Sequence, residues 1–599
     1  MHLVQEGGTQ GHAGARRHAG DTQNSTYRSI STISQTCKGL KDLIDNSSDT
    51  TIWREVYLSI LDSPFVPQKV IAKFLKRKDI PEEGEFDWKK RVVTVISLQK
   101  QLKTLDLSEN IDEYIFTLLE LATAPIPVFP DQPCRPSLNL DWLDKLLTDG
   151  FPKPLVDRLM EKSHNPTPTV AAVASVSDLV KWEVTNVGQQ FYRLVLQTGF
   201  WPHQAVTTPT NTNNYISPDK QEELTRVVAR LRVYDILYPS ASKCWGPFLP
   251  CPASSSLSSS SSSSVLDSSQ PKEPHLLVPD YPFLSAARMV VETDLRESLE
   301  ADNDGGMMIV FDGGPKVWPF FTYESAERDV DEFLEKVDGV DVGDDDDSEG
   351  KRGLNALRMG SAPGFWDGEG TKERWLGVDG GSEIEEALGT SDQPYTEGWD
   401  WAGVEGTWTR ATCSIENPQL LYQFNYDMLE NCQVSSMRLR ITGYSRVHRS
   451  DSSSSITVPP EPMSSSRPSS TPRPFVSSAL QETDKMPDAQ TESAFVKEEE
   501  KYEDVMDSLV YALPVIHFSD EQPGVQSERT IRGTASMISG GIVQWSMISR
   551  DNLQGRDRWV LEAVQIGGIG SGLGAVGMWT SVRHENGDPV GPMWMWRVA

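Results

Sequence analysis

Cysteine is scarce in this chain of 599 residues, which has only six cysteines and no Cys-x-x-Cys pair. The cysteines form neither closely spaced pairs nor the regularly spaced, even-numbered set of a disulfide framework. The pattern therefore predicts free, mostly buried thiols in a reducing compartment. No apolar run approaches the about 18–20 residues that span a bilayer, and the first residues lack the apolar core of a secretory signal. We therefore expect a soluble protein that is cytoplasmic, nuclear or both.

Positive charge is also in short supply. Lys and Arg number 56 against 86 Asp and Glu, which gives a formal net charge of −30. Phosphate backbones and anionic lipid surfaces repel a chain of this charge. We therefore expect neither a nucleic-acid partner nor a membrane partner.

Motifs for catalysis, cofactors or metals are missing as well. The nine histidines are scattered without His-Glu-x-x-His spacing, and no Gly-x-Ser-x-Gly elbow occurs. The acidic run Asp344–Asp347 lacks the alternating ligands and the twelfth-position glutamate of a calcium loop, so a solvated loop is favoured. Gly570–Ala575 fits a dinucleotide-binding glycine pattern, but strand-like residues follow where a helix is required. A glycine-rich barrel corner is therefore the better interpretation, and we expect no catalytic residue, cofactor or metal.

Composition divides the chain into folded and unfolded parts. The unbroken serine tract Ser258–Ser264, the acidic glycine-rich stretch and a Ser/Pro/Thr-rich insert hold too little apolar surface to offset the entropy lost on ordering. The predicted organisation is a disordered tail at 1–24, a two-helix module at 25–62, a helical region at 63–248, a Ser-rich linker at 249–277, a helix at 278–300, a disordered acidic region at 301–399, and a β-domain at 400–599 with a disordered insert at 447–503.

The N-terminal half shows helical periodicity. Apolar residues recur every three or four positions from Ile30 through Cys37 to Ile44, which is typical of an amphipathic helix. A polar break follows, and a second helix begins near Trp53. Another helix is predicted to open at Trp88.

From about Asp400 the apolar pattern changes to period two, which indicates half-buried strands. Met437 and Leu439 alternate with Arg438 and Arg440, and Ser539–Gly541 provides a hairpin turn. About eight such runs predict a single antiparallel β-barrel. Trp594, Trp596 and Val598 share one face of the last strand. We expect Trp579, Trp594 and Trp596 to fill the barrel interior or to seal one end, and His517 to be a satisfied wall residue.

The N-terminal module resembles a known family. Cys37, Leu40, Leu43, Ile44, Trp53 and Arg54 match the second half of an F-box, the helical module that docks substrate receptors onto the Skp adaptor of cullin-RING ubiquitin ligases. The leading Leu-Pro half of that module is not found at residues 7–24. The resemblance implies that Leu40, Leu43, Ile44 and Trp53 contact the adaptor.

The C-terminal third resembles the calycin-like barrel of fungal F-box proteins, which is similar to that of the mammalian F-box-only family. The matching blocks are Asp400–Arg410, Arg532–Thr534, Trp545, Glu562–Gly568, Gly577–Trp579 and Gly591–Trp594, and two shorter blocks from Tyr234 and from Trp245 resemble the helical middle of the same group. The implied fold class is α+β multidomain, with truncated F-box-like helices, a helical middle, a C-terminal antiparallel β-barrel and long disordered inserts.

This resemblance implies a non-catalytic receptor subunit of an SCF-type ubiquitin ligase. Its partners would be the Skp-family adaptor, the cullin and RING subunits that the adaptor recruits, and an unknown protein substrate held by unknown residues of the barrel. Two alternatives remain open. The barrel could bind a small molecule, since an eight-stranded closed barrel can hold one ligand. The chain could also be an interaction scaffold that has lost ligase docking.

Overall fold

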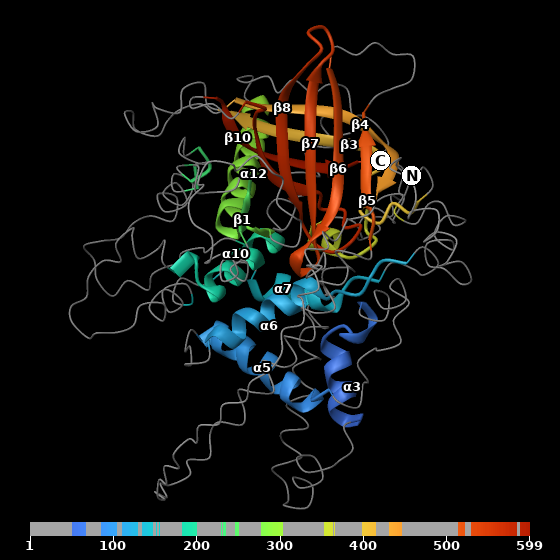
Figure 1. Cartoon of the computed structure of the whole chain (residues 1–599). Coiled ribbons are helices and arrows are strands. Elements are labelled where there is room, and N and C mark those ends of the chain that lie inside the picture. Colours follow the sequence, from blue (N-terminus) through green and yellow to red (C-terminus); the bar gives the residue numbers. More distant parts are fainter. Residues whose placement is uncertain are drawn as a thin grey trace, which may run out of the picture.

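The structure is a computed structural model that gathers helices at one end of the molecule and a β-barrel at the other (Figure 1). It describes residues 51–67, 86–104, 111–129, 135–147, 151, 155, 182–200, 229–230, 232–234, 246–250, 277–303, 353–362, 365, 398–414, 431–445, 513–520, 529–583 and 588–598. The predicted tail at 1–24, the predicted first helix of the F-box-like module, the serine tract Ser258–Ser264 and the insert at 447–503 lie outside the described residues.

The helical end is built from short amphipathic helices. Helix α5 opens at Trp88, as the sequence predicts, and buries its apolar residues at spacings of three or four. Helix α10 begins where the Thr185 hydroxyl accepts a hydrogen bond from the Gly188 amide, and it ends at Gly199, whose φ is 73°. The bounds are α3 Thr51–Ile60, α5 Trp88–Thr104, α6 Ile111–Thr123, α7 Leu138–Leu147 and α10 Asn186–Thr198.

The C-terminal third forms the antiparallel barrel that the sequence predicts. Eight strands close in the order β10-β3-β4-β5-β6-β7-β8-β9. Each strand pairs antiparallel with its neighbours, so the barrel has no free edge. The strands are β3 Gly406–Ser414, β4 Asn431–Ser445, β5 Val515–Ser519, β6 Arg529–Ile538, β7 Ile542–Asp551, β8 Arg556–Gln565, β9 Ala575–Ser581 and β10 Val590–Arg597.

Successive residues of a wall strand face opposite sides of the barrel wall. Met437 and Leu439 point into the barrel, while the intervening Arg438 and Arg440 are exposed, as the period-two pattern predicts. The two cysteines within the described residues, Cys413 and Cys432, are register partners across β3 and β4 and are not joined by a disulfide.

Glycine corners join the strands at the helical end of the barrel. The turn Ser539–Gly541 joins β6 to β7, as predicted. The Gly570–Ala575 segment belongs to the connection from β8 into β9, and therefore forms a barrel corner in place of a dinucleotide loop. At Gly574, φ is +86° and an added Cβ would lie 1.9 Å from the Met595 carbonyl oxygen, so no larger residue fits without backbone movement.

One long helix, α12 (Tyr281–Asn303), packs on the outer wall of the barrel over β10, β9, β3 and β4. A two-stranded antiparallel sheet of β1 (Phe248–Pro250) and β2 (Leu277–Pro279) precedes it. The helix lies where the sequence predicts one.

The tryptophans of the last strand correct one expectation. Trp594 and Trp596 are buried, but they belong to the cluster that contains α12 and the other helices, whereas Met593 and Met595 belong to the interior cluster. They therefore face outward under α12 and do not fill the barrel interior. The third residue, Trp579, is partly buried and packs against the interior cluster.

A second correction concerns the acidic region at 301–399, which the sequence predicts to be disordered throughout. Gly353–Leu357 forms the 3-10 helix η5, and Leu354, Leu357 and Phe365 are buried. Backbone hydrogen bonds from Gly360 to Ile569 and from Ala362 to Gly570 anchor this segment to the β8–β9 connection. The segment is ordered by partners that are distant in sequence.

We predict that Trp594→Ala lowers the free energy of unfolding by about 3–5 kcal/mol, because the indole is fully buried between the barrel wall and the helices. Urea denaturation of the full chain measures this change. The matched control is Leu553→Ala, at a side chain that is 81% exposed, for which the change should stay within about 0.5 kcal/mol. Equal stability of the two variants would contradict the placement of Trp594.

Candidate functional site

Of the four residues expected to contact an adaptor, the structure describes one. Leu40, Leu43 and Ile44 lie outside the described residues. Trp53 lies on α3 with only 7% of its surface exposed, and the Lys89 ammonium lies 5.7 Å from its ring centroid. In the described chain, Trp53 therefore belongs to the core between α3 and α5.

Aromatic rings hold α3 against α5. Phe86 and Trp88 meet edge to face at a centroid distance of 4.6 Å, and Tyr57 and Phe65 contact the same indole at 5.3 and 5.8 Å. Burial raises the pKa of the Tyr57 hydroxyl above its usual range. This cluster fixes the angle at which the N-terminal helices meet.

A buried carboxylate fastens the end of α3 to α7. Asp62 accepts hydrogen bonds from the Ser137 hydroxyl at 2.5 Å and from the Leu138 amide at 3.1 Å. The amide of Asp62 in turn donates to the Asn139 side chain at 2.9 Å. A negative charge at a helix N-terminus satisfies otherwise unpaired amides and opposes the positive end of the helix dipole.

The buried guanidinium of Arg358 ties the segment at 353–362 to the helices. It donates to the carbonyls of Ile126, Arg135 and Pro127 at 2.7, 2.5 and 3.2 Å, and the residue is 2% exposed. Because the same segment is hydrogen-bonded to the β8–β9 connection, Arg358 joins the helical layer to the barrel.

A second buried guanidinium, Arg288, joins α12, α10 and the barrel wall. It donates to the last-turn carbonyls of α10, Leu196 at 2.5 Å and Gln197 at 3.0 Å, and its Nε lies 3.4 Å from a carboxylate oxygen of Glu292. Its Cζ lies 5.1 Å from the centroid of the Trp594 ring. One fully buried side chain thus contacts three elements.

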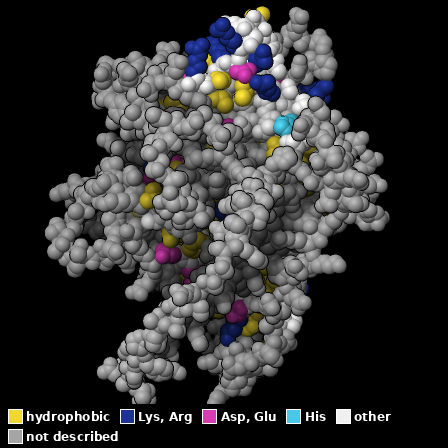
Figure 2. Space-filling model, in the orientation of Figure 1, with side chains coloured by type: hydrophobic (Ala, Val, Ile, Leu, Met, Phe, Trp, Pro, Cys, Tyr) yellow, Lys and Arg dark blue, Asp and Glu magenta, His cyan; other side chains and the backbone are white. Residues whose placement is uncertain are grey.

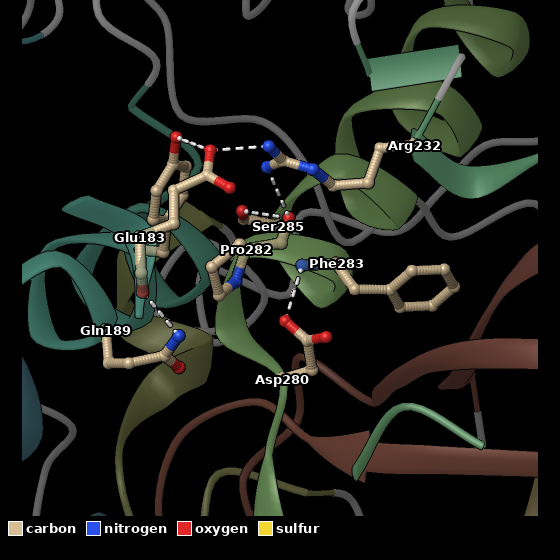
Figure 3. Close-up of polar contacts among 8 residues, drawn as sticks. Glu183, Gln189, Arg232, Asp280, Pro282, Phe283 and Ser285 are labelled. Atoms are coloured by element: carbon tan, nitrogen blue, oxygen red, sulfur yellow. Dashed lines mark hydrogen bonds and ion pairs between the residues drawn. The ribbon is translucent and has the colours of Figure 1, made fainter. Parts of the chain in front are cut away.

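The first turn of α12 is held by a third arginine (Figure 3). Arg232 forms an ion pair with Glu183 and donates to the Pro282 carbonyl at 3.3 Å. The Tyr192 hydroxyl donates to the same Glu183 oxygen at 2.9 Å. Asp280 caps α12 by accepting from the Phe283 amide at 3.3 Å.

The interior of the barrel is filled by aromatic and methionine side chains. The Trp545 ring lies 5.0 Å from Trp408 and 5.3 Å from Phe518 between centroids. The indole N–H groups are also satisfied within the barrel, since Trp408 donates to the Val404 carbonyl at 2.7 Å and Trp545 to the Gln565 side chain at 3.1 Å. This arrangement is typical of a packed core.

One polar side chain of the barrel, Arg410, lies in the middle of β3. Arg410 donates to the Ser435 hydroxyl at 3.3 Å, and burial lowers the pKa of its guanidinium.

The Ser445 hydroxyl and His517 Nε2 are 2.7 Å apart on the barrel wall. His517 is therefore a satisfied wall residue, as predicted, and burial lowers the pKa of its imidazole.

Glu562 is the most perturbed carboxylate of the barrel wall. Burial raises its pKa to about 7, although hydrogen bonds from the Ser546 hydroxyl at 2.5 Å and the Gln544 amide at 3.0 Å act in the opposite direction. Gly246 lies against it, because a Cβ added there would be 3.3 Å from the Glu562 side chain. The chain just before β1 therefore covers this carboxylate.

Within the described ranges, no group of three or more His, Cys, Asp or Glu side chains could hold a metal ion. None of the described helices is both long and apolar enough to cross a membrane. Comparison with protein-family models, with curated proteins and with solved structures finds no significant match for this chain.

Sequence reasoning did not identify the three arginines that join the elements. A signal was present for Arg288, because a lone arginine within the apolar run Phe283–Val291 indicates a buried charge that needs partners. The sequence offered no comparable signal for the carbonyl partners of Arg358, which precede it by more than 220 positions.

We predict that the free energy of unfolding falls by about 3 kcal/mol between about pH 4.5 and about pH 7 through Glu562 alone. The folded chain holds the proton of this carboxyl more tightly than the unfolded chain, so stability is highest below the unfolded pKa and declines until the folded pKa is passed. Chemical denaturation at several pH values, compared between the native chain and Glu562→Gln, isolates this contribution. The exposed Glu405→Gln serves as control, and parallel pH profiles for the native chain and Glu562→Gln would refute the prediction.

Proposed function

We propose that this chain is the substrate-recognition subunit of an SCF-type ubiquitin ligase. In this proposal the N-terminal helices dock onto a Skp-family adaptor through Leu40, Leu43, Ile44 and Trp53, and the adaptor recruits cullin and RING subunits. The barrel selects the protein substrate, and the ligase partners supply the chemistry of ubiquitin transfer.

The observation that supports this proposal most directly is the continuous core between the helices and the barrel. A single buried cluster runs from Trp53 on α3 through α12 to Trp594 and Trp596 on the barrel wall. A receptor that acts by proximity must hold its substrate at a fixed position relative to the docking site, because effective concentration falls when the connection is loose. A shared core between the two ends meets that requirement.

Interior packing weighs against the small-molecule alternative. A ligand-binding barrel needs a cavity in its centre, whereas Trp408, Trp545 and Phe518 meet there in ring contacts. The outer surface and the loops of the barrel are then the parts that can contact a partner.

Adaptor binding separates the ligase proposal from the scaffold alternative. We predict that the chain captures a purified Skp-family adaptor weakly, because the two matching helices of the module bury less than the about 1,200 Å² of a stable interface. Replacing residues 7–24 by a Leu-Pro-containing F-box first helix should give strong capture. Leu40→Asp with Leu43→Asp should abolish it, whereas the exposed barrel control Leu553→Asp should not.

The pull-down is scored with the full chain and quantified by the adaptor recovered. Capture that does not depend on Leu40 and Leu43 would contradict the assigned contact residues. Absence of capture by every version would overturn the ligase proposal in favour of a scaffold.

A further inference from the structure

Although the whole chain is strongly acidic, one face of the barrel carries a concentration of arginine. Figure 2 shows dark-blue side chains at the top of the molecule, where Figure 1 places the end of the β7–β8 hairpin. We name this surface the arginine face. It consists of the exposed residues Arg438, Arg440, Arg532, Arg550, Arg556 and Arg558.

Strand register brings these arginines onto one continuous surface. Ser519 of β5 pairs with Arg440 of β4 on one side and with Arg532 of β6 on the other. Arg550 of β7 pairs with Asp557 of β8, and Asp551 pairs with Arg556. Because neighbouring strands lie about 4.8 Å apart, the face extends about 19 Å across the wall from β4 to β8.

Few carboxylates neutralise this face. Among the described strand residues of β4 to β8, Asp557 is the one exposed carboxylate, and it pairs with Arg532 at 2.9 Å. The Asp551 carboxylate, which accepts from the amides of Leu553 and Gln554 at 3.0 and 3.1 Å, adds a second negative charge beside the six arginines. The arginine face therefore carries a positive excess, in contrast to the net charge of the chain, −30.

We infer that the arginine face binds an extended acidic segment of a partner protein. Arginine presents a planar fork of donors that matches carboxylates in bidentate geometry. About six extended residues cover the width of the face. Leu553, which is 81% exposed in the adjoining turn, offers an apolar side chain against which a protein partner can pack. Only the identification of this partner as a ligase substrate rests on the proposed function; the binding itself does not.

Two other occupants are less compatible with the surface. A nucleic acid is a long polyanion, which the net negative charge of the whole chain repels more strongly than it repels a short acidic segment.

The second occupant is the acidic run Asp344–Asp347 of the chain itself. This run is tethered to Gly353–Leu357, which packs on the β8–β9 connection at the opposite end of β8. The residues from Asp347 to Gly353 span at most about 22 Å, whereas β8 is about 33 Å long. A stretch of that length is shorter than β8, so a contact that includes the β7–β8 turn favours a segment of another protein.

The test uses fluorescence anisotropy of a labelled hexaglutamate peptide with the full chain. We expect binding that weakens as salt is raised, and a loss of at least about tenfold in affinity for the double variant Arg440→Glu with Arg532→Glu. The matched control is Arg54→Glu with Lys145→Glu, two cations of the helical end with side chains 39% and 56% exposed, which changes the net charge equally. Its affinity should stay within about twofold of the native chain.

Three results would overturn the inference: no binding of hexaglutamate, equal loss in both double variants, or stronger binding of a labelled DNA duplex than of the peptide. Tighter peptide binding after Asp344–Asp347 are replaced by asparagine would assign the face to that acidic run in place of an external partner. Peptide binding without adaptor capture would leave the inference standing and would overturn only the ligase proposal.

Discussion

The architecture depends on arginine guanidinium groups that donate to backbone carbonyls between elements. At the end of α10, the last carbonyls have no partner within the helix, and Arg288 of α12 supplies donors to two of them. Burial of such a charge is unfavourable unless its hydrogen bonds are made, so the guanidinium requires α10, α12 and Trp594 to be in place together. Arg358 likewise donates to carbonyls of the connection between α6 and α7. The helical layer and the barrel are thereby fixed as one body.

Arginines join elements inside the molecule and also form an exposed surface on the barrel. In a chain with 56 basic and 86 acidic residues, two groups of arginines have these roles. Arg232, Arg288 and Arg358 are used inside, where they join elements. The arginine face lies outside, on strands whose register the barrel fixes. A rigid barrel holds such a face in one geometry, and this preorganisation lowers the entropic cost of binding.

Much of the barrel was predictable from sequence. Apolar residues such as Met437 and Leu439 alternate with polar ones, and this pattern indicates a strand with one buried face. The same pattern could not say which face of β10 looks inward. Both faces are buried there, since α12 covers the outer one, and both are apolar: Trp594 and Trp596 on one side, Met593 and Met595 on the other. The segment at 353–362 was missed because its order comes from distant carbonyls and not from local composition. Leu40, Leu43 and Ile44 remain predictions that rest on resemblance.

The central claim is that buried arginines make the helices and the barrel one body, and amide hydrogen exchange of the Arg288→Met variant tests it most directly. The account predicts faster exchange in the last turn of α10, in α12 and in β10 together, with β6 and β7 unchanged. The Arg54→Met control, at a partly exposed arginine of α3, should leave all of these elements unaffected. Faster exchange confined to α12, with β10 and α10 protected as in the native chain, would contradict the claim.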